Sequence, residues 1–120
     1  MKTRTAAIAI GVLLVLLALQ AGATGQFRIS YRMGPREPTS AVLVGTVFND
    51  SPRDVVDVWV TAEALNASGT VVATGIAFVA GLLPGRDSVP FVAKVPAVEG
   101  VSMFRIEVTS FRYWALPQSP

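Results

Sequence analysis

The sequence predicts an all-β protein, an antiparallel β-sandwich of six to seven strands preceded by an N-terminal hydrophobic helix. Apolar and polar residues alternate along several segments after position 24, and clusters of Gly, Pro, Asn and Asp separate these segments. No amphipathic helical pattern occurs beyond the N-terminus. These observations favour two packed sheets, with a small β-barrel as the alternative.

The N-terminus is basic, then apolar, then rich in small residues. Lys2 and Arg4 precede an apolar run over 6–19, and Ala-Gly-Ala occupies 21–23. This order is typical of a secretory signal peptide, with cleavage predicted between Ala23 and Thr24.

An uncleaved membrane anchor is the alternative for this segment. As a helix, the run 6–19 would span roughly 21 Å, and extension to residue 23 would give about 27 Å, against a hydrocarbon core of about 30 Å. Both alternatives export residues 24 onward, to the periplasm, the outside of the cell or the outer side of the cytoplasmic membrane. We therefore predict a signal peptide or anchor over 1–23, a β-sandwich over 24–114 and a short proline-containing tail over 115–120.

The first strands are predicted from alternation and from proline. Apolar residues alternate with polar ones over 26–33, which predicts a strand with one buried face, formed by Phe27, Ile29, Tyr31 and Met33. Two prolines within 34–40 predict a loop, and a second strand is expected over 41–48.

The remaining strands follow the same pattern. The third is expected to bury its even positions, Val56, Val58, Val60, Ala62 and Ala64. A turn at 66–69 leads to a hairpin arm over 71–80. Pro90 and Pro96 predict an edge position for the strand around 89–95. In the last strand Phe104, Ile106 and Val108 are expected to face inward.

Several short motifs resemble the FxLYD domains and related immunoglobulin-like modules of exported bacterial proteins. They are Val44-Gly45-Thr46-Val47-Phe48-Asn49, Val56-x-Val58-x-Val60, Leu65-Asn66-Ala67-Ser68-Gly69-Thr70-Val71-Val72, Leu83-Pro84-Gly85 and Phe91. The resemblance covers roughly residues 41 to 108 and implies an immunoglobulin-like fold and a non-catalytic module. Where the residues that name the family would fall, this chain has Glu63, Ala64, Leu65 and Asn66.

Charge and composition argue against several function classes. The net charge of +2 comes from Lys2 and Arg4, because eight basic and eight acidic residues remain after position 24. No basic cluster is left to bind nucleic acid. The chain has no histidine and no cysteine, so it lacks the commonest general base, a thiolate nucleophile and the usual transition-metal ligands. We therefore expect neither an enzyme nor a cofactor.

The acidic residues offer two possible kinds of site, a metal site and a pair of catalytic carboxylates. Asp50, Asp54 and Asp57 form the densest group, but their spacing matches no calcium loop, and we expect a solvated turn rather than a metal site. Catalytic carboxylates drawn from Glu63, Glu99 and Glu107 would define a glycosidase, which the outward strand positions of Glu63 and Glu107 disfavour.

Aromatic residues on outward positions form the candidate partner surface. Trp59 lies between Asp57 and Thr61, and Arg112, Tyr113 and Trp114 end the last strand. Tryptophan, tyrosine and arginine are enriched at protein interfaces. The alternatives are that the second sheet, a loop or the tail covers these rings, or that Tyr113 and Trp114 rest at a membrane interface beside an uncleaved anchor.

The sequence thus predicts an exported, non-catalytic module of the bacterial cell envelope that binds another protein or adds structural support. Its partner would be an envelope or secreted protein, and membrane contact would involve only residues 1–23 if they are not cleaved. The alternative is a dedicated architectural or chaperone-like subunit of an envelope complex, and a hydrolase or metal-dependent enzyme is the third class.

Overall fold

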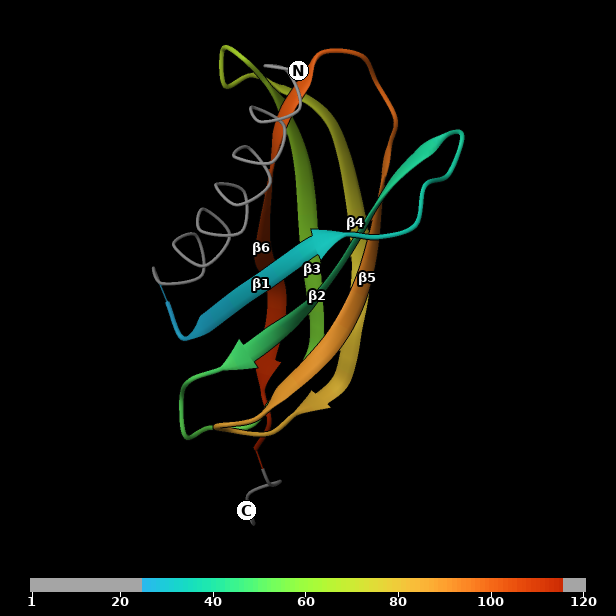
Figure 1. Ribbon diagram of the computed structural model, residues 1–120. Coiled ribbons are helices and arrows are strands. Elements are labelled where there is room, and N and C mark those ends of the chain that lie inside the picture. Colours follow the sequence, from blue (N-terminus) through green and yellow to red (C-terminus); the bar gives the residue numbers. More distant parts are fainter. Residues whose placement is uncertain (1–24, 116–120) are drawn as a thin grey trace.

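The computed structural model describes residues 25–115, which form two three-stranded antiparallel sheets (Figure 1). One sheet has the order β1-β2-β5 and the other has the order β4-β3-β6. The strands are β1 (Phe27–Met33), β2 (Ser40–Asn49), β3 (Val55–Asn66), β4 (Val71–Leu83), β5 (Ser88–Pro96) and β6 (Val101–Tyr113). The all-β prediction is confirmed for these residues, and the predicted N-terminal helix lies outside them.

The two sheets bury a shared core. The first sheet contributes Ile29, Leu43 and Val47, which are buried together with Val60 and Ile106 of the second sheet. Each strand supplies alternate residues to this core because side chains of a strand point to opposite faces in turn. The hydrophobic effect of burying these side chains is the main force that holds the sheets together.

Tyr31 adds a polar link between the sheets. Its ring is buried in the core, and its hydroxyl donates a hydrogen bond to the carbonyl oxygen of Phe104 on β6, 3.1 Å away. Burial raises the pKa of Tyr31 to about 12, because the apolar surroundings disfavour the phenolate. The hydroxyl therefore stays neutral and keeps its acceptor throughout the physiological pH range.

Two core assignments made from the sequence are wrong. Met33 is exposed because β1 ends there and the following residues turn over the outer face of its sheet. Val56 is only half-buried, and Val55 takes its place in the core. Asp57 has φ 53°, and between Val56 and Val60 the pairing of β3 shifts register against both of its neighbours, β4 and β6. The resulting bulge lets Val55 and Val58 both point inward.

β5 is an edge strand, as its prolines predict, and it approaches the edge of β4 closely. A Cβ atom added at Gly75 would overlap the carbonyl oxygen of Lys94. The residues of β4 that turn toward the core side are accordingly small, Ala73, Gly75 and Ala77. The close approach explains why β4 has its larger apolar residues on the other face.

A buried asparagine joins three segments at one end of the sandwich. The side-chain amide of Asn49 donates to the carbonyl oxygens of Arg53, Leu83 and Pro84, at 2.8, 3.3 and 3.3 Å. Its side-chain oxygen accepts the backbone N–H of Ser51 at 3.1 Å. Since buried polar groups must be paired to avoid a desolvation penalty, Asn49 fixes the ends of β2 and β4 relative to the 50–54 turn.

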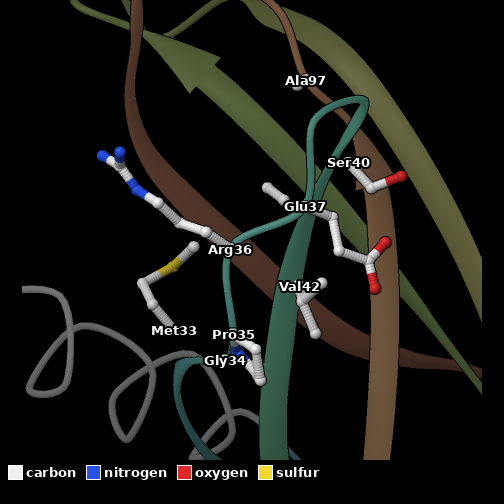
Figure 2. Close-up of a pocket in the computed structure, with 9 residues that line it drawn as sticks. Met33, Gly34, Pro35, Arg36, Glu37, Ser40, Val42 and Ala97 are labelled. Carbon is white, nitrogen blue, oxygen red and sulfur yellow. The ribbon is translucent and has the colours of Figure 1, made fainter.

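At the other end, the loop 34–39 folds back over the outer face of the first sheet (Figure 2). The N–H of Gly34 donates to the carbonyl oxygen of Val42 at 2.7 Å, and Val42 is buried beneath the loop. The carboxylate of Glu37 lies 3.0 Å from the ammonium group of Lys94 on β5. Figure 2 shows Arg36 and Glu37 pointing to opposite sides of the loop. The loop thus covers an apolar residue of the outer face.

Candidate interaction surface

Trp59 lies on the outer face of the β4-β3-β6 sheet, as the sequence predicts. It pairs with Phe78 of β4 on one side and with Ser110 of β6 on the other. The Trp59 and Phe78 rings meet edge to face, with centroids 5.2 Å apart and an angle of 70° between the planes. This geometry is a favourable one for aromatic pairs. The two rings therefore form one preorganised surface element.

Ile76 extends this element along β4, opposite Thr61 of β3. The exposed fractions are 40% for Trp59, 51% for Phe78 and 68% for Ile76. We call these three residues the outer-face patch. Sequence periodicity missed Ile76 and Phe78, because both faces of β4 are apolar and hydropathy does not alternate along it. The alternation of small and large residues over 73–78 was the available signal.

The β6 side of the same face is polar, and it includes one ion pair and one pair of hydrogen-bonded hydroxyls. The Arg105 guanidinium donates to the Glu63 carboxylate at 2.7 and 2.9 Å, which raises the pKa of Arg105. Thr61 and Thr109 share a hydrogen bond of 2.7 Å between their hydroxyls. The outer-face patch is therefore bordered by polar groups, an arrangement resembling the polar rim around the apolar centre of a protein interface.

The predicted group Arg112, Tyr113 and Trp114 does not form one surface with Trp59. Arg112 forms an ion pair with Asp57, beside the bulge of β3. Tyr113 turns the other way, because it pairs with the buried Val55. Trp114 follows the strand and donates its backbone N–H to the carbonyl oxygen of Asp54 at 3.1 Å. The structure thus separates the predicted surface into the outer-face patch and a second aromatic group at one end of the sandwich.

That second group is built around Tyr113. Its ring packs edge to face on Phe111 with centroids 5.4 Å apart, and Phe111 packs in the same way on Phe27 at 4.9 Å. The Arg53 guanidinium lies 3.6 Å from the centre of the Tyr113 ring, a cation–π contact. The Tyr113 hydroxyl donates to the side-chain oxygen of Gln26. Even so, 41% of Tyr113 and 48% of Trp114 remain exposed.

None of the eight acidic residues is buried, and all eight lie in the described part of the chain. Asp50 forms an ion pair with Arg28 at 2.7 Å, and the hydrogen bonds from this guanidinium lower the pKa of Asp50. Asp54 accepts the backbone N–H of Gly85 at 2.9 Å, while Asp57 pairs with Arg112. The three aspartates considered as a metal site therefore have different partners. Within residues 25–115, no group of three or more acidic, histidine or cysteine side chains is arranged to hold a metal ion.

The described surface has at least three hollows. One, of about 550 Å³, lies beneath the loop 34–39 and is lined by Met33, Arg36 and Val42 among others (Figure 2). A second, of about 570 Å³, lies beside Arg112 and Trp114. A third, of about 490 Å³, is lined by Tyr31, Arg32 and Pro90 among others. In the first two hollows, ion pairs hold the charged residues Glu37, Asp57 and Arg112.

The predicted cleavage position between Ala23 and Thr24 lies outside the described residues, as do residues 1–23 and most of the tail. In the part of the chain that the structure describes, no helix is long and apolar enough to cross a membrane.

Comparison with known proteins yields distant structural similarity and no family. No family model matches the chain, and no curated protein matches it. Among solved structures, a β-glucuronidase from glycoside hydrolase family 2 aligns with a TM-score of 0.38 and 15% sequence identity. The alignment covers 59% of this chain and 8% of the β-glucuronidase, so the chain spans a small part of that enzyme's length.

Proposed function

We propose that this protein is an exported, non-catalytic module of the bacterial cell envelope that binds another protein through the outer-face patch. The observation that carries this proposal is the exposed group of Trp59, Ile76 and Phe78, which lies on the same face as the Arg105–Glu63 ion pair. Large exposed apolar groups bordered by polar residues are typical of protein interaction sites. The Trp59–Phe78 contact also holds the rings in place before a partner arrives, which lowers the entropic cost of binding.

The strand pairing supports an immunoglobulin-like topology, which we propose as the finer description of the fold. β2 pairs with β5 and β3 pairs with β6, as strands B with E and C with F do in immunoglobulin domains. β4 lies beside β3, where variable-type domains have an additional strand. This topology agrees with the proposed relation to FxLYD-type domains of exported proteins.

The proposed lack of catalysis rests on the chemistry that is present. The chain has no histidine and no cysteine, and each of its acidic residues is at least partly exposed to solvent. Enzymes often prepare a catalytic acid by burying it, and none of these carboxyl groups is buried. The partner surface is instead apolar and aromatic, which suits binding.

Export is proposed from residues 1–23, which act either as a cleaved signal peptide or as an anchor. Intact mass of the protein recovered from the envelope of the source cells distinguishes these two. A chain beginning at Thr24 supports the signal peptide, and a chain of 120 residues supports the anchor. Recovery of the protein from the cytoplasm alone would contradict export.

Site-specific crosslinking in cells tests the binding surface. Phe78 is replaced by a photoreactive benzoylphenylalanine, and Val92, which is exposed on the outer face of the other sheet, receives the same replacement as the matched control. We expect a discrete crosslinked species at position 78 and none at position 92. Equal crosslinking at both positions, or none at position 78, would contradict the proposal.

The identity of the crosslinked protein bears on the alternative function. One protein captured in a constant ratio would indicate a dedicated architectural or chaperone-like subunit of an envelope complex. Several captured proteins would indicate a general binding module.

A further inference from the structure

The chain enters the sandwich at the end that carries the second aromatic group. Only Gly25 and Gln26 separate residue 24 from the first residue of β1. Gln26 is held at this end by the Tyr113 hydroxyl and by bonds to Asn49 and Ser51, at 3.4 and 3.3 Å. A segment anchored at 1–23 would therefore be joined to the sandwich by a very short tether. The tether would bring this end, rather than the opposite one, close to the anchoring membrane.

We call this end the aromatic pole, defined by Arg53, Leu82, Tyr113 and Trp114. Leu82 is exposed near the end of β4, and Arg53 covers one side of the Tyr113 ring. Figure 1 shows that β1 begins at the same end of the sandwich where β4 and β6 finish. Tryptophan and tyrosine are enriched at the membrane–water interface, where one part of the ring is in an apolar region and the other in a wet one.

The opposite end of the sandwich has a different composition. It consists of the loop 34–39 and the turns over 67–70 and 97–100, whose residues are mainly proline, glycine, serine, threonine and glutamate. No aromatic residue lies in these three segments. Tryptophan and tyrosine, which are enriched at the headgroup region of a bilayer, are thus found at the aromatic pole and not in these three segments. The aromatic pole is also the end that is joined to residues 1–24.

Charge at the aromatic pole is balanced. Arg28, Arg53 and Arg86 are accompanied by Asp50, Asp54 and Asp87. Arg28 pairs with Asp50, and Arg86 donates to the Asp50 carbonyl oxygen at 2.9 Å. Basic clusters that bind anionic lipid carry an excess of unpaired positive charge. The aromatic pole has no such excess of positive charge. Its balanced charge and its aromatic rings therefore suit the interface of a bilayer whose headgroups carry no net charge.

We infer that, in the full chain, the aromatic pole rests in the headgroup region of the bilayer that holds residues 1–23. Trp114, Tyr113 and Leu82 enter the interface, and the β-strands stand away from the membrane. This inference rests on the anchor alternative of the proposed function and extends membrane contact beyond residues 1–23. In this orientation the outer-face patch, on the side of the sandwich, stays accessible to a partner.

The two tryptophans of the chain provide a direct test. Trp59→Phe leaves Trp114 as the reporter of the aromatic pole, and Trp114→Phe leaves Trp59 as the reporter of the outer-face patch. The full chain carrying each substitution is reconstituted in phosphatidylcholine vesicles that contain lipids brominated near the headgroup, which quench nearby tryptophan. Circular dichroism confirms that both variants are folded.

We expect bromolipid to quench the Trp114 reporter at least several-fold more than the Trp59 reporter, without a requirement for anionic lipid. Equal quenching of both reporters, or no quenching of Trp114, would overturn the inference. Quenching that appears only after phosphatidylglycerol is added would overturn the assignment to uncharged headgroups. The vesicles contain no protein partner, so none of these results bears on crosslinking at position 78. A mature chain that begins at Thr24 would overturn the inference and leave the proposed binding function intact.

Discussion

The two sheets differ in how much of the apolar surface on their outer faces is covered by other parts of the chain. On the β1-β2-β5 sheet, the loop 34–39 buries Val42, and the Arg28 guanidinium lies 4.3 Å from the centre of the Phe48 ring. On the β4-β3-β6 sheet, Ile76 and Phe78 are left exposed. Each sheet has apolar residues on its outer face, but most of those on the β1-β2-β5 sheet are covered by other groups of the chain.

Loop length explains the difference. The connection between β1 and β2 is long enough to fold back over the sheet, and Gly34 lets its backbone approach Val42 and Val44 closely. The turns that flank β4 are short: Gly69, with φ 82°, closes one of them, and Gly85 packs against Pro52 in the other. Neither turn is long enough to reach Ile76 near the middle of the strand. An apolar residue on this face therefore needs a partner from elsewhere to become buried.

Asn49→Ala is expected to have the largest effect, because the scaffold of both faces depends on this junction. The substitution leaves three carbonyl oxygens without their donor and should lower the free energy of unfolding by about 3 kcal/mol. Urea unfolding followed by tryptophan fluorescence and by circular dichroism measures the loss. Asn66→Ala is the control, because Asn66 accepts bonds only from an exposed turn and should cost about 1 kcal/mol. Equal losses would contradict the special role of Asn49.

Raising the pH above 10 is expected to weaken the link between the sheets through Tyr31. Its folded-state pKa of about 12 lies above its ordinary value of 10.0, so its contribution is complete below pH 10 and is lost as the pH rises toward 12. The loss should reach about 2 kcal/mol at pH 12. Tyr31→Phe should cost about 1 kcal/mol at neutral pH but remove this pH dependence. An identical alkaline decline in both proteins would assign it to other groups.

Val42→Thr and Ile76→Thr compare the covered face with the exposed one. Both replacements keep a β-branched side chain, but the Val42 site would bury an unpaired hydroxyl, at a cost of about 1–2 kcal/mol. At Ile76 the hydroxyl reaches water, and the free energy of unfolding should change by less than about 0.5 kcal/mol. Thermal unfolding of the two variants measures the contrast. A large loss at Ile76 would mean that the outer-face patch stabilises the fold of the isolated chain.

The smallest effect is expected at the Arg28–Asp50 pair, which is half exposed. Hydrogen bonds from Arg28 lower the pKa of Asp50 below its ordinary value of 3.8, so the stability they add is present above pH 3.8 and lost as the pH falls through the folded-state pKa. NMR titration of the Asp50 carboxyl should show a midpoint that rises toward 3.8 in Arg28→Gln. An unchanged midpoint would show that the pair does not persist in solution.

Sequence patterns were sufficient for the strands and for much of the core. Period-two alternation located β1, β3 and β6, because each has a clear apolar face. Prolines located the edge position of β5. The alternation pattern wrongly predicted that Val56 is in the core. The left-handed conformation of Asp57 reverses the alternation of side chains at this point, and no residue type in the sequence indicates that conformation.

The candidate surface was only half predictable. Trp59 was identified from its place among polar neighbours, and the structure confirms that it is exposed. The sequence did not identify Ile76 and Phe78, because β4 is apolar on both faces. Only the close approach of β5 at Gly75 decides which face of β4 is packed. Arg112 and Tyr113 are neighbours in the chain but point to opposite sides of their strand.

Local residue order determined the β class and the turns, since each depends on neighbours a few positions apart. It is also the only basis of the signal-peptide or anchor prediction for residues 1–23, which stays a prediction. The pairing of distant strands, the burial of Val42 under a loop and the exposure of Ile76 were decided only by tertiary structure. They depend on which segments come close enough to exclude water from a side chain, and contacts between segments far apart in sequence leave no local pattern.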